Sequence, residues 1–143
     1  MSLGEFADFL DASLHVLRRE TPPAYRRVAE RLAGRAVHFE VSEATFALRV
    51  APDGHELTAA ADGSLALGLD RSVVLELVEA RASLPEAVLG ERLRPRGLPE
   101  ELGRFFDALV AYLEGAVRAP SMPRLYRAYA RGELIPADLE EGR

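Results

Sequence analysis

The 143-residue chain contains no cysteine, lysine, asparagine, glutamine or tryptophan. Because there is no cysteine, disulfides, zinc–thiolate sites and thiol catalysis are excluded. Arginine, alanine, leucine and glutamate are abundant instead, which indicates codon bias in a GC-rich, bacterial genome. Runs of arginine in this chain therefore need not reflect guanidinium chemistry.

The chain also lacks long apolar runs and a positive net charge. No stretch approaches the ~18–20 apolar residues of a membrane span. The first residues, MSLGEFADFLDASL, have no basic flank of the kind that a signal peptide carries, so we expect a cytoplasmic protein. The net charge of −5 and the pI near 5.3 argue against a nucleic-acid partner.

Signatures of catalysis, metals and cofactors are absent as well. The three histidines, His15, His38 and His55, lie far apart and form no H-x-x-x-H pattern. His38 and Glu40 are two residues apart on one face of a predicted strand, where a solvated strand face is the favoured interpretation. No serine lies in a G-x-S-x-G context, and neither phosphate-binding glycine motif occurs. The sequence therefore predicts no catalytic residue, no metal site and no cofactor.

The length and composition fit one globular domain. A chain of this length buries ~68–70% of its unfolded surface, and 48% of the residues are hydrophobic. We predict a single domain over residues 1–143 with a core of about 23–117. Residues 3–20 form a helical N-terminal extension, and residues 121–143 form a C-terminal helix and tail.

Apolar residues recur at helical spacing in six segments. Ser83 and Glu86 form a capping-box signature at the start of the fourth, and Gly132 ends the sixth. The helices are predicted at 3–20, 23–33, 71–81, 84–89, 98–117 and 121–132, and an irregular tail follows. The longest helix has a wide apolar stripe that comprises Leu98, Leu102, Phe105, Phe106, Leu109, Val110, Leu113 and Val117.

Between the second and third helices the apolar period changes to two, which predicts β-strands. Short turns at APDG (51–54) and DG (62–63) join them, and the DG turn is a strong hairpin signal. Turns this short favour consecutive antiparallel pairing, with one face of the sheet covered. The predicted strands are 37–41, 46–50, 56–61 and 64–69, and the fold class is α+β.

The segment ERLRPRG (91–97) predicts a short fifth strand, which completes an antiparallel five-stranded sheet. Pro95 cannot donate a ladder hydrogen bond, so this strand belongs at an edge. Arg92, Arg94 and Arg96 would share its solvent face, where they oppose edge-to-edge aggregation, and Leu93 would point inward. Contact between these arginines and a ligand is the alternative interpretation.

Small residues on both faces of the third and fourth strands also allow two interpretations. They either let the helices pack closely or leave a space lined by large neighbouring side chains. In the second case a mostly apolar cavity of ~300 Å³ or more lies under the 98–117 helix, with Phe105 and Leu109 in its wall. The small residues are Ala59, Ala60, Ala61, Ala66 and Gly68.

The run SLPEAVLGERLRPRG, followed by LPEELGRFF, resembles the sterol carrier protein 2-like (SCP2) domains. In that family a small-x-x-P-x-x-A segment leads into a G-K-L-x-I-x-G strand and then a helix. Gly90, Leu93 and Gly97 occupy the pattern positions, and the order of elements matches over residues 28–117. The resemblance implies a five-stranded sheet with helices on one side, which enclose a hydrophobic tunnel for lipids or other apolar molecules.

The resulting hypothesis is non-catalytic binding of a lipid or other apolar small molecule between sheet and helices. The alternative is an accessory protein that binds an enzyme partner through its apolar helix face and has no ligand of its own. An enzyme is the least favoured function. A carboxylate or phosphate head group of the ligand would meet Arg92, Arg94 and Arg96. The cavity wall is predicted to comprise Phe39, Phe46, Leu48, Leu67, Leu77, Val88, Leu93, Phe105, Leu109 and Leu113.

Overall fold

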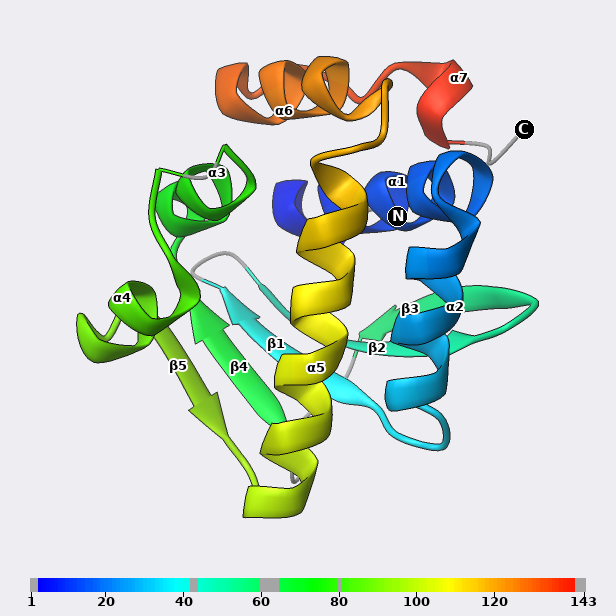
Figure 1. Cartoon of the computed structure of the whole chain (residues 1–143). Helices are drawn as coiled ribbons and strands as arrows, with labels where there is room; N and C mark the ends of the chain where they lie inside the picture. The colour runs from blue at the N-terminus through cyan, green and yellow to red at the C-terminus, as the bar shows by residue number, and fades with distance from the viewer. Residues whose placement is uncertain (1–2, 42–43, 60–64, 80, 141–143) are drawn as a thin grey trace.

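Helices and strands alternate in blocks along the computed structural model, which describes residues 3–41, 44–59, 65–79 and 81–140. Figure 1 shows the strands in one sheet, with the long helix α5 in front of it. In chain order the elements are α1 (Glu5–Glu20), α2 (Pro22–Arg31), β1 (Val37–Val41), β2 (Ala44–Ala51), β3 (Gly54–Ala59), β4 (Ala66–Leu69), α3 (Arg71–Val78), α4 (Leu84–Leu89), β5 (Leu93–Arg96), α5 (Pro99–Ala116), α6 (Met122–Arg131) and α7 (Ala137–Glu140).

The sheet is mixed, with the strand order β3-β2-β1-β4-β5. β1 pairs antiparallel with β2, and β2 with β3, as the sequence predicts. The prediction for the fourth strand is wrong, because β4 pairs with β1 in parallel and not with β3. The predicted DG turn at 62–63 lies outside the described residues. β5 forms an antiparallel edge strand, as predicted, and its neighbour is β4.

Burial explains why β4 lies inside the sheet. All of its residues are buried, and β1 and β5 occupy its two hydrogen-bonding edges. Its alternation of leucine with alanine and glycine resembles that of a half-exposed strand. However, the Arg94 side chain covers Gly68, since a Cβ built there would lie 3.1 Å from Arg94 Nε. A strand buried on both faces is typical of the interior of a sheet with parallel pairing.

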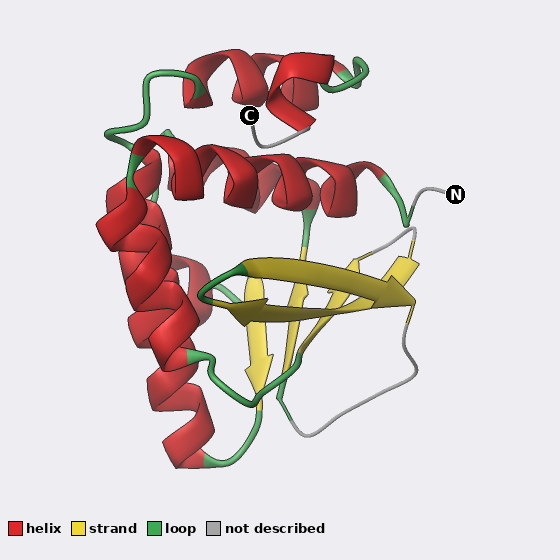
Figure 2. Ribbon diagram, turned by 90° about the vertical axis from the view of Figure 1, so that its right-hand side faces the viewer, coloured by secondary structure: helices red, strands yellow, loops and turns green. Residues whose placement is uncertain are grey.

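The helices cover one face of the sheet, as Figure 2 shows. α2 and α5 pack against each other over that face, and α1 crosses the end of the sheet. α6 and α7 lie on the far side of α1 and pack against it. The helical turn α7 falls in the tail that the sequence predicts as irregular. Its Leu139 is 1% exposed, and this burial holds the turn in place.

Small side chains bring α5 against α2. Ala108, Ala111 and Gly115 are buried on α5, and a Cβ built at Gly115 would lie only 2.5 Å from the Cβ of Ala24 on α2. The apolar stripe predicted for α5 is therefore too wide. Small residues of α5 face α2, and some of the large apolar residues of the predicted stripe face solvent instead. Three members of that stripe are exposed: Leu98, Val110 and Val117.

Local signals set several helix ends as predicted. The N–H of Glu86 donates to Ser83 Oγ at 3.2 Å, and the N–H of Ser83 donates to the Glu86 carboxylate at 3.3 Å, which completes the capping box. Gly132 ends α6 with a φ of 68°, a left-handed conformation that glycine adopts without strain. These boundaries need no tertiary contact.

Candidate functional site

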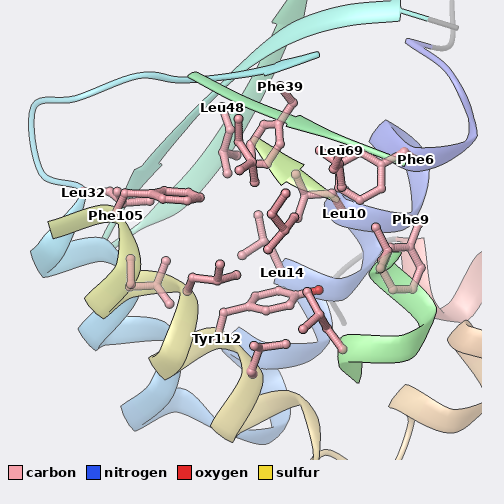
Figure 3. Close-up of a pocket in the computed structure, with 18 residues that line it drawn as sticks. Phe6, Phe9, Leu10, Leu14, Leu32, Phe39, Leu48, Leu69, Phe105 and Tyr112 are labelled. Carbon is pink, nitrogen blue, oxygen red and sulfur yellow. The ribbon is translucent and has the colours of Figure 1, made fainter. Parts of the chain in front are cut away.

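A cavity of about 90 Å³ lies between the sheet and helices α1, α2, α3 and α5. Figure 3 shows side chains from both layers pointing into this space. The walls expose carbon almost exclusively. The sequence predicts a cavity of ~300 Å³ or more, so the observed space is smaller than predicted.

Alternation along the strands supplies the sheet side of the cavity. Phe39 of β1 lies beside Leu67 of β4, and Leu69 of β4 lies beside Leu93 of β5. Because paired residues project from the same face, these side chains form one apolar surface toward the helices. Leu48 of β2 extends that surface toward the other edge of the sheet.

Helices supply the other walls. The α1 residues recur at helical spacing, so one turn after another points into the same space. The α1 side consists of Phe6, Phe9, Leu10 and Leu14. The remaining helical wall consists of Val28 and Leu32 from α2, Val74 and Leu77 from α3, and Phe105, Ala108, Leu109, Tyr112 and Leu113 from α5.

Eight of the ten wall residues predicted from the sequence line this cavity, namely Phe39, Leu48, Leu67, Leu77, Leu93, Phe105, Leu109 and Leu113. The other two, Phe46 and Val88, do not. Phe46 is fully buried and stacks on Phe39, with 5.3 Å between the ring centroids. Val88 on α4 is half-buried and packs against the core. Contact between any of these side chains and a ligand stays a prediction.

Sequence reasoning misses the contribution of α1 to the wall. It treats residues 3–20 as an extension, whereas α1 is buried on two sides. Phe6, Leu10 and Leu14 face the cavity, and Phe9 also stacks on Tyr129 of α6 at 4.6 Å between centroids. The spacing of these residues shows that they are buried, but it does not show what covers them.

Tyr112 is the polar member of the wall. Its hydroxyl donates a hydrogen bond to Ser13 Oγ at 2.7 Å, and the Ser13 hydroxyl donates to the Leu10 carbonyl at 2.8 Å. Burial raises the pKa of Tyr112 to about 12, so the phenol is protonated at neutral pH. No carboxylate or imidazole occurs among the lining residues that the structure describes. The wall therefore suits an apolar group held by surface burial.

The cavity wall is most exposed between α3 and α5. Leu77 of α3 and Leu109 and Leu113 of α5 are only half-buried, whereas Leu67 and Leu48 on the sheet side are buried. The elements that carry these leucines thus separate the cavity from solvent on this side.

The small strand residues do not create the cavity, contrary to the sequence-based expectation. Ala66 and Gly68 pair with Arg96 and Arg94 of β5, on the sheet face that points away from the helices. Ala59 is exposed on the edge strand β3. Ala60 and Ala61 lie outside the described ranges. The cavity instead lies among large side chains that do not interlock completely.

The three arginines lie away from the cavity wall. In β5, Arg94 and Arg96 project from the face opposite to the buried Leu93, and Arg92 precedes the strand. The exposed fractions of the Arg92, Arg94 and Arg96 side chains are 35%, 49% and 61%. Their ion-pair partners are Glu76, Asp70 and Glu40, respectively. A contact of these arginines with a ligand head group stays a prediction.

Among the described residues, no helix combines the length and the apolar character that a membrane crossing requires. No family model and no curated protein matches the sequence.

Two solved structures share the fold at low sequence identity. The UbiJ-SCP2 ubiquinone synthesis protein superposes with a TM-score of 0.55 and 18% identity, over 73% of this chain and 88% of that one. The conserved hypothetical protein TT1886 from Thermus thermophilus, described as possibly a sterol carrier protein, superposes with a TM-score of 0.50 and 16% identity, over 79% of this chain and 90% of that one. The SCP2-like α+β fold predicted from the sequence is confirmed, with a mixed sheet in place of the antiparallel one.

Proposed function

We propose that this SCP2-like domain binds an apolar small molecule, or the acyl part of a lipid, without catalysing a reaction. The observation that carries the proposal is the carbon-lined cavity between the sheet and α1, α2, α3 and α5. The names of the two structures that share the fold, an SCP2 protein of ubiquinone synthesis and a possible sterol carrier, support an apolar ligand.

The carbon-lined walls favour an apolar ligand over a polar one. An apolar group in this space makes dispersion contacts with the walls and leaves water at the same time. A polar group would lose its hydrogen bonds to water and meet almost no partner in the wall.

The size of the cavity limits what it holds without a change of shape. Ligand pockets commonly have about 300–1,000 Å³, and a cavity of about 150 Å³ accepts benzene. A lipid chain therefore requires the wall to move. The half-buried Leu77, Leu109 and Leu113 mark the boundary between α3 and α5 as the place where the wall yields.

A pair of tryptophan variants on α5 tests the proposal. Leu109 lies in the cavity wall, whereas its neighbour Val110 is 44% exposed and outside the wall. We expect the unmodified chain and Val110→Trp to take up a fluorescent fatty-acid probe in a saturable titration. Leu109→Trp should fill the cavity and abolish uptake with only a mild loss of stability.

The stability of the Leu109→Trp variant shows whether the cavity has room for a larger side chain. If the core is tightly packed, Leu109→Trp would overpack the interior and lower the free energy of unfolding by about 1–3 kcal/mol. Native mass spectrometry of the gently purified protein provides the second measurement, since a bound apolar molecule adds mass. An unmodified chain that takes up no apolar probe and carries no such molecule refutes the proposal.

A further inference from the structure

The fold brings His55 of β3 next to an aspartate and a histidine of α1, more than 35 residues earlier in the sequence. Asp11 and His15 lie one turn apart on α1, and His55 lies on β3. His55 Nε2 is 2.7 Å from Asp11 Oδ1, and His15 Nε2 is 3.7 Å from the same oxygen. The two imidazole rings have centroids 4.6 Å apart. Two of the three histidines of the chain thus meet around one carboxylate.

The distances in this cluster fit a common metal ion. One ligand atom from each of the three residues lies within 4.8 Å of the other two. Two ligand atoms on a tetrahedral zinc ion, each at about 2.0–2.1 Å, are roughly 3.3 Å apart. The two separations from Asp11 Oδ1, 2.7 and 3.7 Å, lie on either side of that value, and the ligand atoms of the two histidines lie within 4.8 Å of each other. Side-chain rotations would therefore have to bring the two imidazoles closer together to place all three atoms on one ion.

We propose that Asp11, His15 and His55 bind one first-row divalent transition-metal ion, with Zn²⁺ as the representative probe. Imidazole nitrogen together with a carboxylate suits Zn²⁺ and its neighbours, whereas Ca²⁺ and Mg²⁺ prefer oxygen ligands alone. Three protein ligands leave a fourth position for water.

Hydrogen bonding explains only one of the two contacts that Asp11 makes with the histidines. The contact between His55 and Asp11 has the length of a hydrogen bond, but the 3.7 Å between His15 and Asp11 is too long for one.

The cluster is accessible on one side and closed on the other. The His55 side chain is 1% exposed, whereas those of His15 and Asp11 are 30% and 43% exposed. An ion therefore reaches the cluster from solvent past Asp11 and His15. None of the three residues lines the apolar cavity, so metal binding does not depend on the proposed ligand. A bound ion would tie helix α1 to the edge strand β3.

Calorimetric titration of the untagged, EDTA-treated full chain with Zn²⁺ at neutral pH tests the site. We expect one ion per chain, with an affinity that falls about tenfold or more in His15→Ala, His55→Ala and Asp11→Asn. His38→Ala is the matched control, because it removes the third histidine from a different strand, β1, and should leave the affinity unchanged. Zn²⁺ should also raise the melting temperature of the unmodified chain but not that of His15→Ala.

Two results would overturn the site. The first is an unmodified chain that shows no saturable binding of one Zn²⁺. The second is an affinity that is unchanged in His15→Ala, or reduced equally by His38→Ala. Since His55 is buried, its variant can fail to fold, and circular dichroism of each variant identifies that case. In that case the zinc affinities of His15→Ala, at a half-buried position, and of the near-isosteric Asp11→Asn test the site.

Discussion

At the scale of single residues, Arg94 covers the outer face of β4. Its side chain lies over Gly68, where a Cβ would meet Arg94 Nε at 3.1 Å. The guanidinium is half exposed, lies 3.7 Å from Asp70 Oδ1 and donates a hydrogen bond to the Glu91 carbonyl at 3.2 Å. Exposed ion pairs of this kind contribute little to stability, about 0–1 kcal/mol. Arg94 thus shields a small central residue without holding the fold together.

We therefore expect Arg94→Ala to change the free energy of unfolding by less than about 0.5 kcal/mol, measured by urea denaturation. Phe46→Ala is the contrasting variant, because Phe46 is fully buried and its truncation should cost about 3–5 kcal/mol. A loss of several kcal/mol on replacing Arg94 would show that its ion pair is structurally essential and would contradict this account.

At the scale of elements, the close contact between α5 and α2 depends on a glycine. A Cβ at Gly115 would lie 2.5 Å from Ala24 Cβ and 3.0 Å from Thr21 Oγ1, so the two helices could not keep their present separation. We expect Gly115→Ala to lower the free energy of unfolding by about 1–3 kcal/mol. Chemical denaturation measures the difference.

Gly103 provides a matched control on the same helix. It is exposed, and a Cβ there would meet nothing within 4 Å. Gly103→Ala should therefore raise the free energy of unfolding by about 0.5–1 kcal/mol, because alanine loses less backbone entropy in a helix. Equal effects of the two substitutions would show that helix propensity, and not the contact with α2, determines the result.

The helices could be predicted from the sequence because their signals are local. The capping box at Ser83, the proline in the first turn of α5 and the left-handed Gly132 act within a few residues of the helix ends. The position of β4 could not be predicted in this way. Its place between β1 and β5 depends on the path of the connection from β3 to β4. A period-two pattern identifies a strand and its buried face, but it does not identify the neighbouring strands in the sheet.

The same limit applies to the candidate sites. The strand and α5 residues of the wall are predictable because alternation and helical spacing identify an inward face. The α1 residues Phe6 and Leu10 carry the same signal, but the sequence does not reveal that α1 folds back over the sheet. Likewise, His55 meets Asp11 only because α1 packs against the edge strand β3.

At the scale of the whole molecule, the absence of lysine and cysteine simplifies alkaline titration. Tyrosines are then the side chains that titrate between about pH 9 and 12. Burial raises the pKa of Tyr112 to about 12, and burial also raises those of Tyr25 and Tyr126. Above about pH 10 the unfolded chain releases these protons before the folded chain does. The stability that neutral tyrosines provide is therefore present below pH 10 and lost as the pH rises toward 12.

We expect the free energy of unfolding, measured in urea, to fall steeply above about pH 10. Tyr112 alone contributes at most about 1.4 kcal/mol per pH unit to this slope. Tyr112→Phe should flatten the pH dependence, and tyrosinate absorbance of the native protein should show the late titration directly. An unchanged slope in that variant would mean that the phenol reaches solvent before the fold opens.

The position of α1 between the sheet and the last helices has a consequence for biosynthesis. Phe9 needs Tyr129 to cover it, and the Glu20 carboxylate accepts a hydrogen bond of 2.8 Å from the N–H of Ser121, which lies 101 residues further along. Helix α1 is thus completed by α6, which leaves the ribosome only after the sheet and α5 have been made. Until then the nascent chain presents an uncovered aromatic surface, which is the kind of surface that chaperones bind. Closure of this long loop should also slow folding relative to helical proteins whose neighbours in sequence are neighbours in space.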